Sequence, residues 1–170
     1  MAFPALAPLY WASEYRAVRS GRKRRPKRGY TSTSINASAV PMTSQPLRLP
    51  PGADLRRALE ALAQHAQSGF VVAGIGSLRD PRIRFANAAA ATTLPGDFEL
   101  LTLSGSVTPV GAHLHMTVAD QHGQVFGGHV TEGNIIRTTA EILLAWLPAH
   151  ALARAYDPAT GFDELTVRTV

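Results

Sequence analysis

The segment that most constrains this chain has the pattern of a β-hairpin and carries three of the chain's six histidines on its two strands. Apolar residues alternate with polar or small ones on both sides of the turn-forming stretch 120–124. They are Leu114, Met116, Val118, Phe126 and Val130. Such alternation is typical of strands that bury one face. Because paired strands bury their apolar residues on the same side, the parity predicts His115 opposite His129, with His113 on the same face.

Three imidazoles on one sheet face suit a divalent metal ion. Three protein ligands with an open fourth position are the arrangement of catalytic zinc sites. The pattern therefore predicts that His113, His115 and His129 bind Zn²⁺ or another divalent metal. A hydrogen-bonded cluster in a pocket or at a subunit interface is the alternative, and the sequence leaves both open.

The candidate for a catalytic group is Glu141. A carboxylate near such histidines could orient them or act as a general base. The alternative is a solvated side chain, or one paired with Arg137. No Ser-His-Asp or Cys-His order is legible, so nucleophilic catalysis has no support and no catalytic residue is assigned.

Charge is divided unevenly along the chain. Residues 1–41 hold eight Lys and Arg against one acid, whereas residues 42–170 hold nine Arg, no Lys and eleven acids. The basic run consists of Arg22, Lys23, Arg24, Arg25, Lys27 and Arg28. These side chains could bind DNA phosphates by releasing counterions, the alternative being a solvated tail. Beyond the run, the basic cluster available for DNA is Arg79, Arg82 and Arg84.

Residues 1–45 have little apolar periodicity and are expected to form a disordered basic leader ahead of a folded domain of residues 46–170. Met42 is an alternative start. The chain has no cysteine, which excludes disulfides and thiolate metal sites and favours a cytoplasmic location. No apolar run approaches the roughly 20 residues that span a bilayer, so we expect no membrane partner.

The pattern predicts one helix and about seven strands. The helix is expected from an Asp54 cap to about residue 67, because apolar residues recur there at helical spacing. The strands are expected at 47–49, 70–75, 82–85, 98–107, the two arms of the histidine hairpin, and 135–147. Their short connections favour an α+β domain with a mostly antiparallel sheet rather than alternating βαβ units.

Residues 95–106, Pro-Gly-Asp-Phe-Glu-Leu-Leu-Thr-Leu-Ser-Gly-Ser, resemble the signature of the PPC (plants and prokaryotes conserved) domain. The His-Leu-His strand, the Gly-Gly-His strand, residues 138–141 and residues 154–165 are similar to the segments that follow it there. The likeness runs in order from about Leu47 to Val167. It implies a mostly antiparallel sheet around one main helix, assembled as a homotrimer.

The resemblance also implies candidate functions. Plant members follow an AT-hook in nuclear chromatin proteins, and some members look like metal binders through histidines matching the three above. Two departures matter: Asp97 stands where the plant signature has Arg, and Arg24 stands where the hook core needs Gly. The resemblance favours a DNA-binding or regulatory homotrimer, with a zinc-dependent enzyme or small-ligand binder as the first alternative and a scaffold without chemistry as the second.

Overall fold

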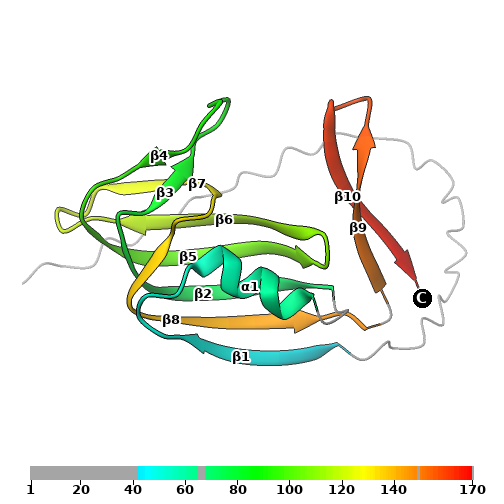
Figure 1. Cartoon of the computed structure of the whole chain (residues 1–170), viewed down its shortest axis with the longest axis horizontal. Coiled ribbons are helices and arrows are strands. Elements are labelled where there is room, and N and C mark those ends of the chain that lie inside the picture. Colours follow the sequence, from blue (N-terminus) through cyan, green and yellow to red (C-terminus); the bar gives the residue numbers. More distant parts are fainter. Residues whose placement is uncertain (1–41, 65–67, 149, 170) are drawn as a thin grey trace, which may run out of the picture. The chain divides into compact units, whose positions relative to one another are not determined.

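The computed structural model describes residues 42–64, 68–148 and 150–169, and contains one helix and ten strands over these ranges (Figure 1). Their bounds are β1 (Thr43–Leu49), α1 (Leu55–Ala63), β2 (Gly69–Arg79), β3 (Arg82–Arg84), β4 (Thr92–Thr93), β5 (Asp97–Thr108), β6 (Gly111–Ala119), β7 (Val125–Val130), β8 (Ile135–Trp146), β9 (His150–Asp157) and β10 (Phe162–Thr169). Eight strands form one antiparallel sheet in the order β1-β8-β2-β5-β6-β7-β3-β4. The predicted α+β class is confirmed.

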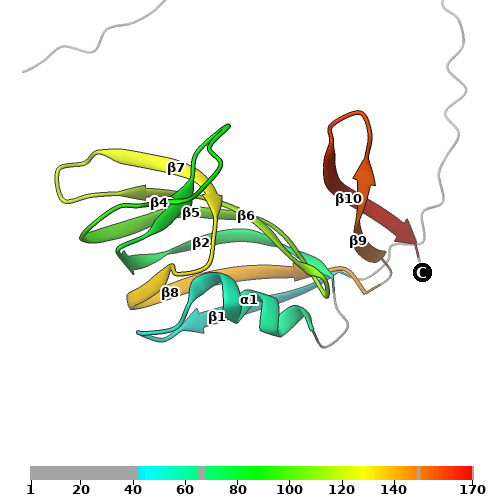
Figure 2. The same ribbon diagram turned by 45° about the horizontal axis from the view of Figure 1, so that its top comes forward.

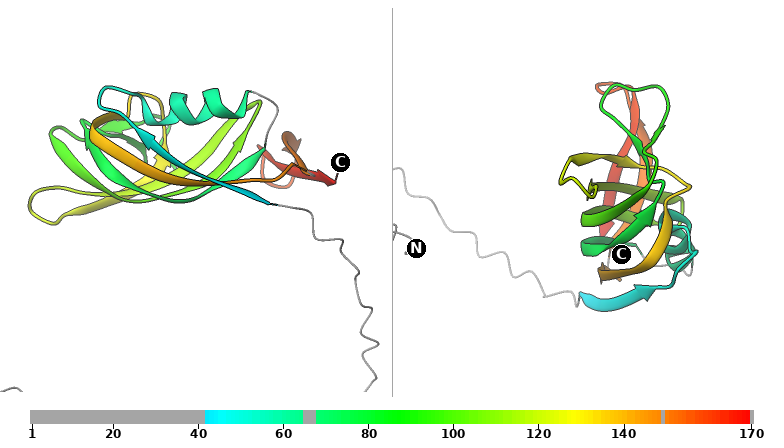
Figure 3. Two further views of the ribbon diagram at one scale, coloured as in Figure 1. Left: turned by 90° about the horizontal axis from the view of Figure 1, so that it is seen from below. Right: turned by 90° about the vertical axis from the view of Figure 1, so that its left-hand side faces the viewer.

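Helix α1 packs on one face of this sheet (Figure 3). Asp54 caps it, because its Oδ1 accepts a hydrogen bond from the Arg57 backbone N–H at 3.1 Å. Leu55, Leu59 and Ala63 recur four residues apart and are completely buried. The helix ends at Ala63, and the predicted extension to residue 67 reaches positions outside the described ranges.

The core lies between α1 and the inward side chains of the central strands. It includes Leu78, Leu100, Leu103, Leu114, Val118, Ile136 and Leu144, each no more than 2 % exposed. The alternation predicted for the histidine hairpin is therefore confirmed, since Leu114 and Val118 are buried on the helix side while His113 and His115, which alternate with them, point away. No helix in the described parts of the chain is long and apolar enough to cross a membrane.

Four strands differ from the expectation, namely β2, β4, β9 and β10. Strand β2 continues to Arg79 instead of ending near Ile75, because register shifts after Val71 and Gly76 bend it past its glycines without ending the pairing. The two-residue strand β4 is too short to leave a periodic pattern. Hairpin β9–β10 was not predicted, because the surfaces of its strands are mostly small or charged residues rather than an apolar stripe.

Hairpin β9–β10 forms its own two-stranded sheet (Figure 2). The backbone N–H of Leu152 in β9 donates to Ser68 Oγ at 3.2 Å. Further along β9, Arg154 donates to Ser106 Oγ in β5 at 2.7 Å. These two contacts connect the hairpin to the main sheet beside the start of β6.

Buried Asn134 holds the short strand β3 in place. Its side-chain amide accepts from the Arg82 backbone N–H at 2.9 Å and donates to the Arg82 carbonyl at 3.0 Å and the Thr131 carbonyl at 2.7 Å. A buried amide with these partners is satisfied and fixes the neighbouring backbone. Strand β3 is thereby held against β7, which brings Arg84 opposite His129.

Candidate functional site

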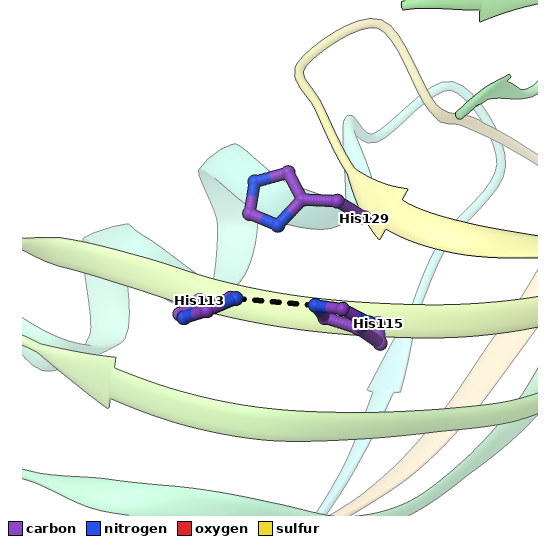
Figure 4. A group of neighbouring side chains, drawn as sticks. All are labelled: His113, His115 and His129. Atoms are coloured by element: carbon purple, nitrogen blue, oxygen red, sulfur yellow. Dashed lines mark hydrogen bonds between the residues drawn. The ribbon is translucent and has the colours of Figure 1, made fainter. Parts of the chain in front are cut away.

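The predicted register of the histidine hairpin is confirmed. His115 in β6 pairs directly with His129 in β7, and His113 lies two residues earlier on β6 (Figure 4). Directly paired residues of an antiparallel sheet point to the same face. The three rings therefore gather on the face opposite α1, with ring centroids 5.0–5.5 Å apart.

The ring nitrogens lie close enough to share one ion. Nε2 of His113 is 3.1 Å from Nε2 of His115, and one nitrogen from each of the three rings falls within 4.8 Å of the others. Two nitrogens on a tetrahedral zinc ion at its usual bond length lie about 3.3 Å apart. The Nε2 atoms of His113 and His115 on β6 already have about this spacing. The ligand nitrogen of His129 lies within 4.8 Å of both.

His129 also carries an unpartnered polar atom. Its Nδ1 is buried and makes no hydrogen bond within the described residues. A buried ring nitrogen without a partner is costly and is usually explained by an ion or water. The donor set, three imidazoles and no thiolate, suits zinc and other borderline divalent metals. The residues present therefore fit a metal ion.

Helix α1 stabilises the point where β6 and β7 separate. Their pairing ends at His115–His129, which leaves the Ala112 and Val130 carbonyls without cross-strand partners. The Arg56 guanidinium donates to both carbonyls, at 2.8 and 2.9 Å. These two carbonyls belong to the neighbours of His113 and His129, so Arg56 fixes the backbone that carries both rings.

Glu60 holds the Arg56 side chain in place, and we call the two residues the Arg56–Glu60 clamp. Oε1 of Glu60 accepts from Arg56 Nε at 2.9 Å and from the Ala112 backbone N–H at 3.0 Å. Both side chains are mostly buried, with 21 % and 23 % of their surface exposed. A charge-assisted network of this kind holds its partners more firmly than a neutral hydrogen bond does.

Two glycines let the neighbouring strands approach the histidine strands closely. Gly105 in β5 has φ +140°, and a Cβ there would meet the His113 carbonyl oxygen at 2.0 Å. A Cβ on Gly128 would lie 2.8 Å from the Arg84 carbonyl oxygen. Any larger residue at these positions would displace β6 or β3 and the site residues on them.

The surroundings of His113 and His129 lower the pKa of both rings and so disfavour their protonation. Burial, and then the positive charges of His113, Arg84 and Arg56, lower the pKa of His129 to about 4. Burial also lowers the pKa of His113, followed by the charges of Arg154 and His115, with Glu164 acting in the opposite direction. Neutral imidazoles are the form that binds metal.

A hollow of about 520 Å³ surrounds the cluster. Besides the histidines, charged side chains from four elements line it: Arg56 of α1, Arg84 of β3, Arg154 of β9, and Asp163 and Glu164 of β10. The sequence interpretation missed all of these except Arg84, which was grouped with Arg79 and Arg82 as a DNA-contact candidate. The alternation of β3 signals that Arg84 lies on a polar face, but not that β3 pairs with β7.

Glu141 is not brought to the histidines. It lies exposed on β8, opposite Ile75 of β2, and β2 and β5 separate β8 from β6. Within this chain the strand order separates Glu141 from the imidazoles, which favours the alternative of a solvated side chain. Its expected partner Arg137 instead pairs with Asp97 at 2.8 Å.

The candidate DNA-binding residues Arg22, Lys23, Arg24, Arg25, Lys27 and Arg28 lie outside the described residues.

The lowered pKa of His129 predicts a pH dependence of stability in the metal-free protein. An unfolded imidazole takes up a proton near pH 6.5, whereas folded His129 does so only near pH 4. The unfolded state therefore binds more protons in this window, and the contribution of His129 to the free energy of unfolding falls as the pH is lowered. In urea titrations at pH 7 and 4.5, His129→Asn should lose less stability than the wild type. His122→Asn, in the exposed β6–β7 turn, is the control; equal losses in all three proteins would contradict the prediction.

Two curated relatives illustrate the similarity of this chain to known proteins. It is 49% identical to the bifunctional protein GlmU of a Synechococcus strain over 127 residues, which are 74% of this chain and 20% of that protein. It is 35% identical to AT-hook motif nuclear-localized protein 21 of Arabidopsis thaliana over 118 residues, covering 65% of this chain and 41% of that protein. The chain thus spans about a fifth of the GlmU relative.

Two solved structures share the fold. A hypothetical protein from Salmonella is 34% identical with a TM-score of 0.74, covering 77% of this chain and 96% of that one. A metal-containing protein from Archaeoglobus fulgidus is 25% identical with a TM-score of 0.63, covering 73% of this chain and 93% of that one.

The sequence pattern of one family matches residues 37–148, which include the helix, the whole eight-stranded sheet and all three clustered histidines. With this match and the relatives above, the chain belongs to the Plants and Prokaryotes Conserved domain family, abbreviated PCC or PPC.

Proposed function

We propose that this protein is a metal-dependent binder of small ligands, with Zn²⁺ or another divalent ion held by His113, His115 and His129. One observation carries the proposal: three imidazole nitrogens from two paired strands lie within 4.8 Å of one another. The unpartnered Nδ1 of His129 supports it. So does the metal-containing relative from Archaeoglobus fulgidus.

The chain's own residues prepare this site. The Arg56–Glu60 clamp orients the backbone beneath His113 and His129, and burial keeps these rings unprotonated at neutral pH. A zinc ion bound by three protein ligands supplies a Lewis acid with an open position for a ligand or water. Of the carboxylates, Glu164 lines the hollow together with the histidines, whereas Glu141 does not.

Zinc titration of the full chain tests this function. By calorimetry and elemental analysis, the wild type should bind one Zn²⁺ per chain. Replacement of a ligand, as in His115→Ala or His129→Ala, should weaken zinc binding by more than about 100-fold, since loss of even a supporting group costs 10- to 100-fold. Zinc should also raise the melting temperature of the wild type, because it binds only the folded state.

His122→Ala is the matched control, because its exposed ring lies in the β6–β7 turn outside the cluster. It should keep wild-type zinc affinity, and circular dichroism should show all variants folded. Absence of zinc from the wild type, or unchanged zinc binding in both ligand variants, would contradict the proposal and favour a scaffold without chemistry.

We further propose that the protein assembles as a homotrimer through the sheet face opposite α1. This face carries exposed apolar side chains on adjacent central strands: Val72 and Ile75 of β2, Leu101 of β5 and Leu143 of β8, which are 38–56 % exposed. Ile75 and Leu143 line a mostly apolar hollow of about 640 Å³, edged by Arg48 and Glu141. A contiguous apolar patch on a sheet face is typical of an interface between copies.

Light scattering coupled to gel filtration tests the trimer. The wild type should have three times the 18.2 kDa mass of one chain. Charges placed in the middle of the patch, as in the double variant Ile75→Glu/Leu143→Glu, should give monomers, because burying two carboxylates per copy is costly. Val125→Glu, at an exposed apolar position on β7, should stay trimeric. A wild-type monomer, or a double variant that stays trimeric, would refute this assembly.

DNA binding is the second candidate function, favoured by the plant relative whose name carries the AT-hook. The charge distribution assigns it to the basic leader of residues 1–45, ahead of the domain of residues 46–170. From Met42 onward the chain has more acids than arginines and no lysine. The domain itself therefore lacks the positive excess that attracts nucleic acid.

Replacement of all six basic residues of the run 22–28 by Gln tests this role in the full chain. Duplex DNA binding should weaken at least tenfold, and the slope of log affinity against log salt should fall by roughly 0.9 per lost phosphate contact. The matched control replaces Arg48, Arg57 and Arg168 of the domain and should bind like the wild type. Unchanged affinity and slope in the six-residue variant would rule out the leader as the DNA-binding element.

A further inference from the structure

The histidine cluster lies in a row of polar side chains that crosses four strands. Ser104 of β5 pairs with His115 of β6, His115 pairs with His129 of β7, and His129 pairs with Arg84 of β3. Because paired residues share a face, the Arg84 side chain emerges beside the His129 ring. Arg84 and His129 also line the same hollow.

A second guanidinium reaches the cluster from hairpin β9–β10. Arg154 donates to Ser106 Oγ at 2.7 Å, and Ser106 pairs directly with His113. Arg154 therefore lies on the His113 side of the cluster, whereas Arg84 lies on the His129 side. The two arginines flank the three imidazoles.

The side chains of the three arginines that line the hollow differ in their hydrogen-bond and ion-pair partners. Arg56 is fully engaged with Glu60 and two backbone carbonyls. The side chain of Arg84 makes no hydrogen bond or ion pair within the described part of the chain. The side chain of Arg154 donates only to a neutral hydroxyl there. Asp163 and Glu164 line the hollow as well but form no ion pair with either arginine.

Two partly buried guanidinium groups without counterions beside a metal site are suited to an anion. A guanidinium presents a planar fork of N–H donors that matches the oxygens of a carboxylate or phosphate. The hollow, about 520 Å³, has the size of sites for small molecules. An uncharged ligand would leave both partly buried cations in the hollow without a counterion.

We propose that the ligand of this site is a small oxyanion, a carboxylate or a phosphate, held beside the histidine cluster by Arg84 and Arg154. The inference rests on the proposed metal site and names its ligand class. Because the Arg84 side chain has no partner within the described residues, its guanidinium N–H donors are free for the anion. Arg154 brings the hairpin into the site, so ligand binding should also fix β9–β10 against β5.

Calorimetric titration of the full chain with inorganic phosphate and with acetate tests the proposal, on metal-free and zinc-loaded protein whose zinc content is measured in each sample. Arg84→Gln and Arg154→Gln should each weaken anion binding about tenfold, the usual effect of one charge-assisted hydrogen bond. Arg168→Gln is the matched control, because Arg168 is exposed on β10 and does not line the hollow. Tighter binding of phosphate points to phosphoryl ligands, and tighter binding of acetate points to carboxylates.

The outcomes separate this inference from the metal site. If zinc binds at one per chain while both arginine variants keep wild-type anion affinity, the inference is overturned and the metal site stands. If no zinc binds, the metal site fails, and the titrations of metal-free protein still decide: weaker anion binding in Arg84→Gln supports the arginine pair, and equal binding overturns it. Arg84→Gln removes no contact within the fold, so its folded state should match that of the wild type by melting temperature.

Discussion

The pairing of β6 with β7 is the constraint on which the candidate site depends. One register puts Leu114 and Val118 into the core under α1 and, on the other face, His115 against His129. A shift of one residue would reverse both faces at once, exposing the core and burying imidazoles. The hydrophobic effect that holds the sheet together thus also positions the three histidines. Arg56 then secures the end of this pairing, because it caps the carbonyls released where the strands part.

The strands near the site could be predicted because apolar and polar residues alternate along each of them, which shows which side chains are buried. Alternation along β6 and β7 fixes which residues are buried, and this was enough to predict the face and partner of His115. The order of strands in the sheet is different, since nothing within β8 indicates that β2 and β5 lie between it and β6. For that reason the sequence left the role of Glu141 open between a group near the histidines and a solvated side chain. Arg154 was missed because its neighbours on β9 are alanines, whose pattern carries no strand period.

The site combines elements of unequal rigidity. The histidines stand on β6 and β7, which lie inside the main sheet, whereas Arg84 stands on a three-residue strand held by Asn134. Arg154 stands on a hairpin joined to the sheet by few contacts. Under the proposed function, histidines on the main sheet would hold the ion, while arginines on short or separate elements would contact the exchanging ligand. The apolar patch on β8, β2 and β5 shares the sheet face of the histidines, but none of its four side chains lines the hollow around them.

X-ray absorption at the zinc edge of the zinc-loaded chain measures the central claim most directly, because it reports the atoms around the ion. We expect four nitrogen or oxygen neighbours at about 2.0–2.1 Å, three of which show the outer-atom scattering pattern of imidazole. Substitution of His129 should reduce the imidazole count by one. A spectrum dominated by oxygen neighbours, or one that His129 substitution leaves unchanged, would mean that zinc binds elsewhere and that the three rings are a structural cluster.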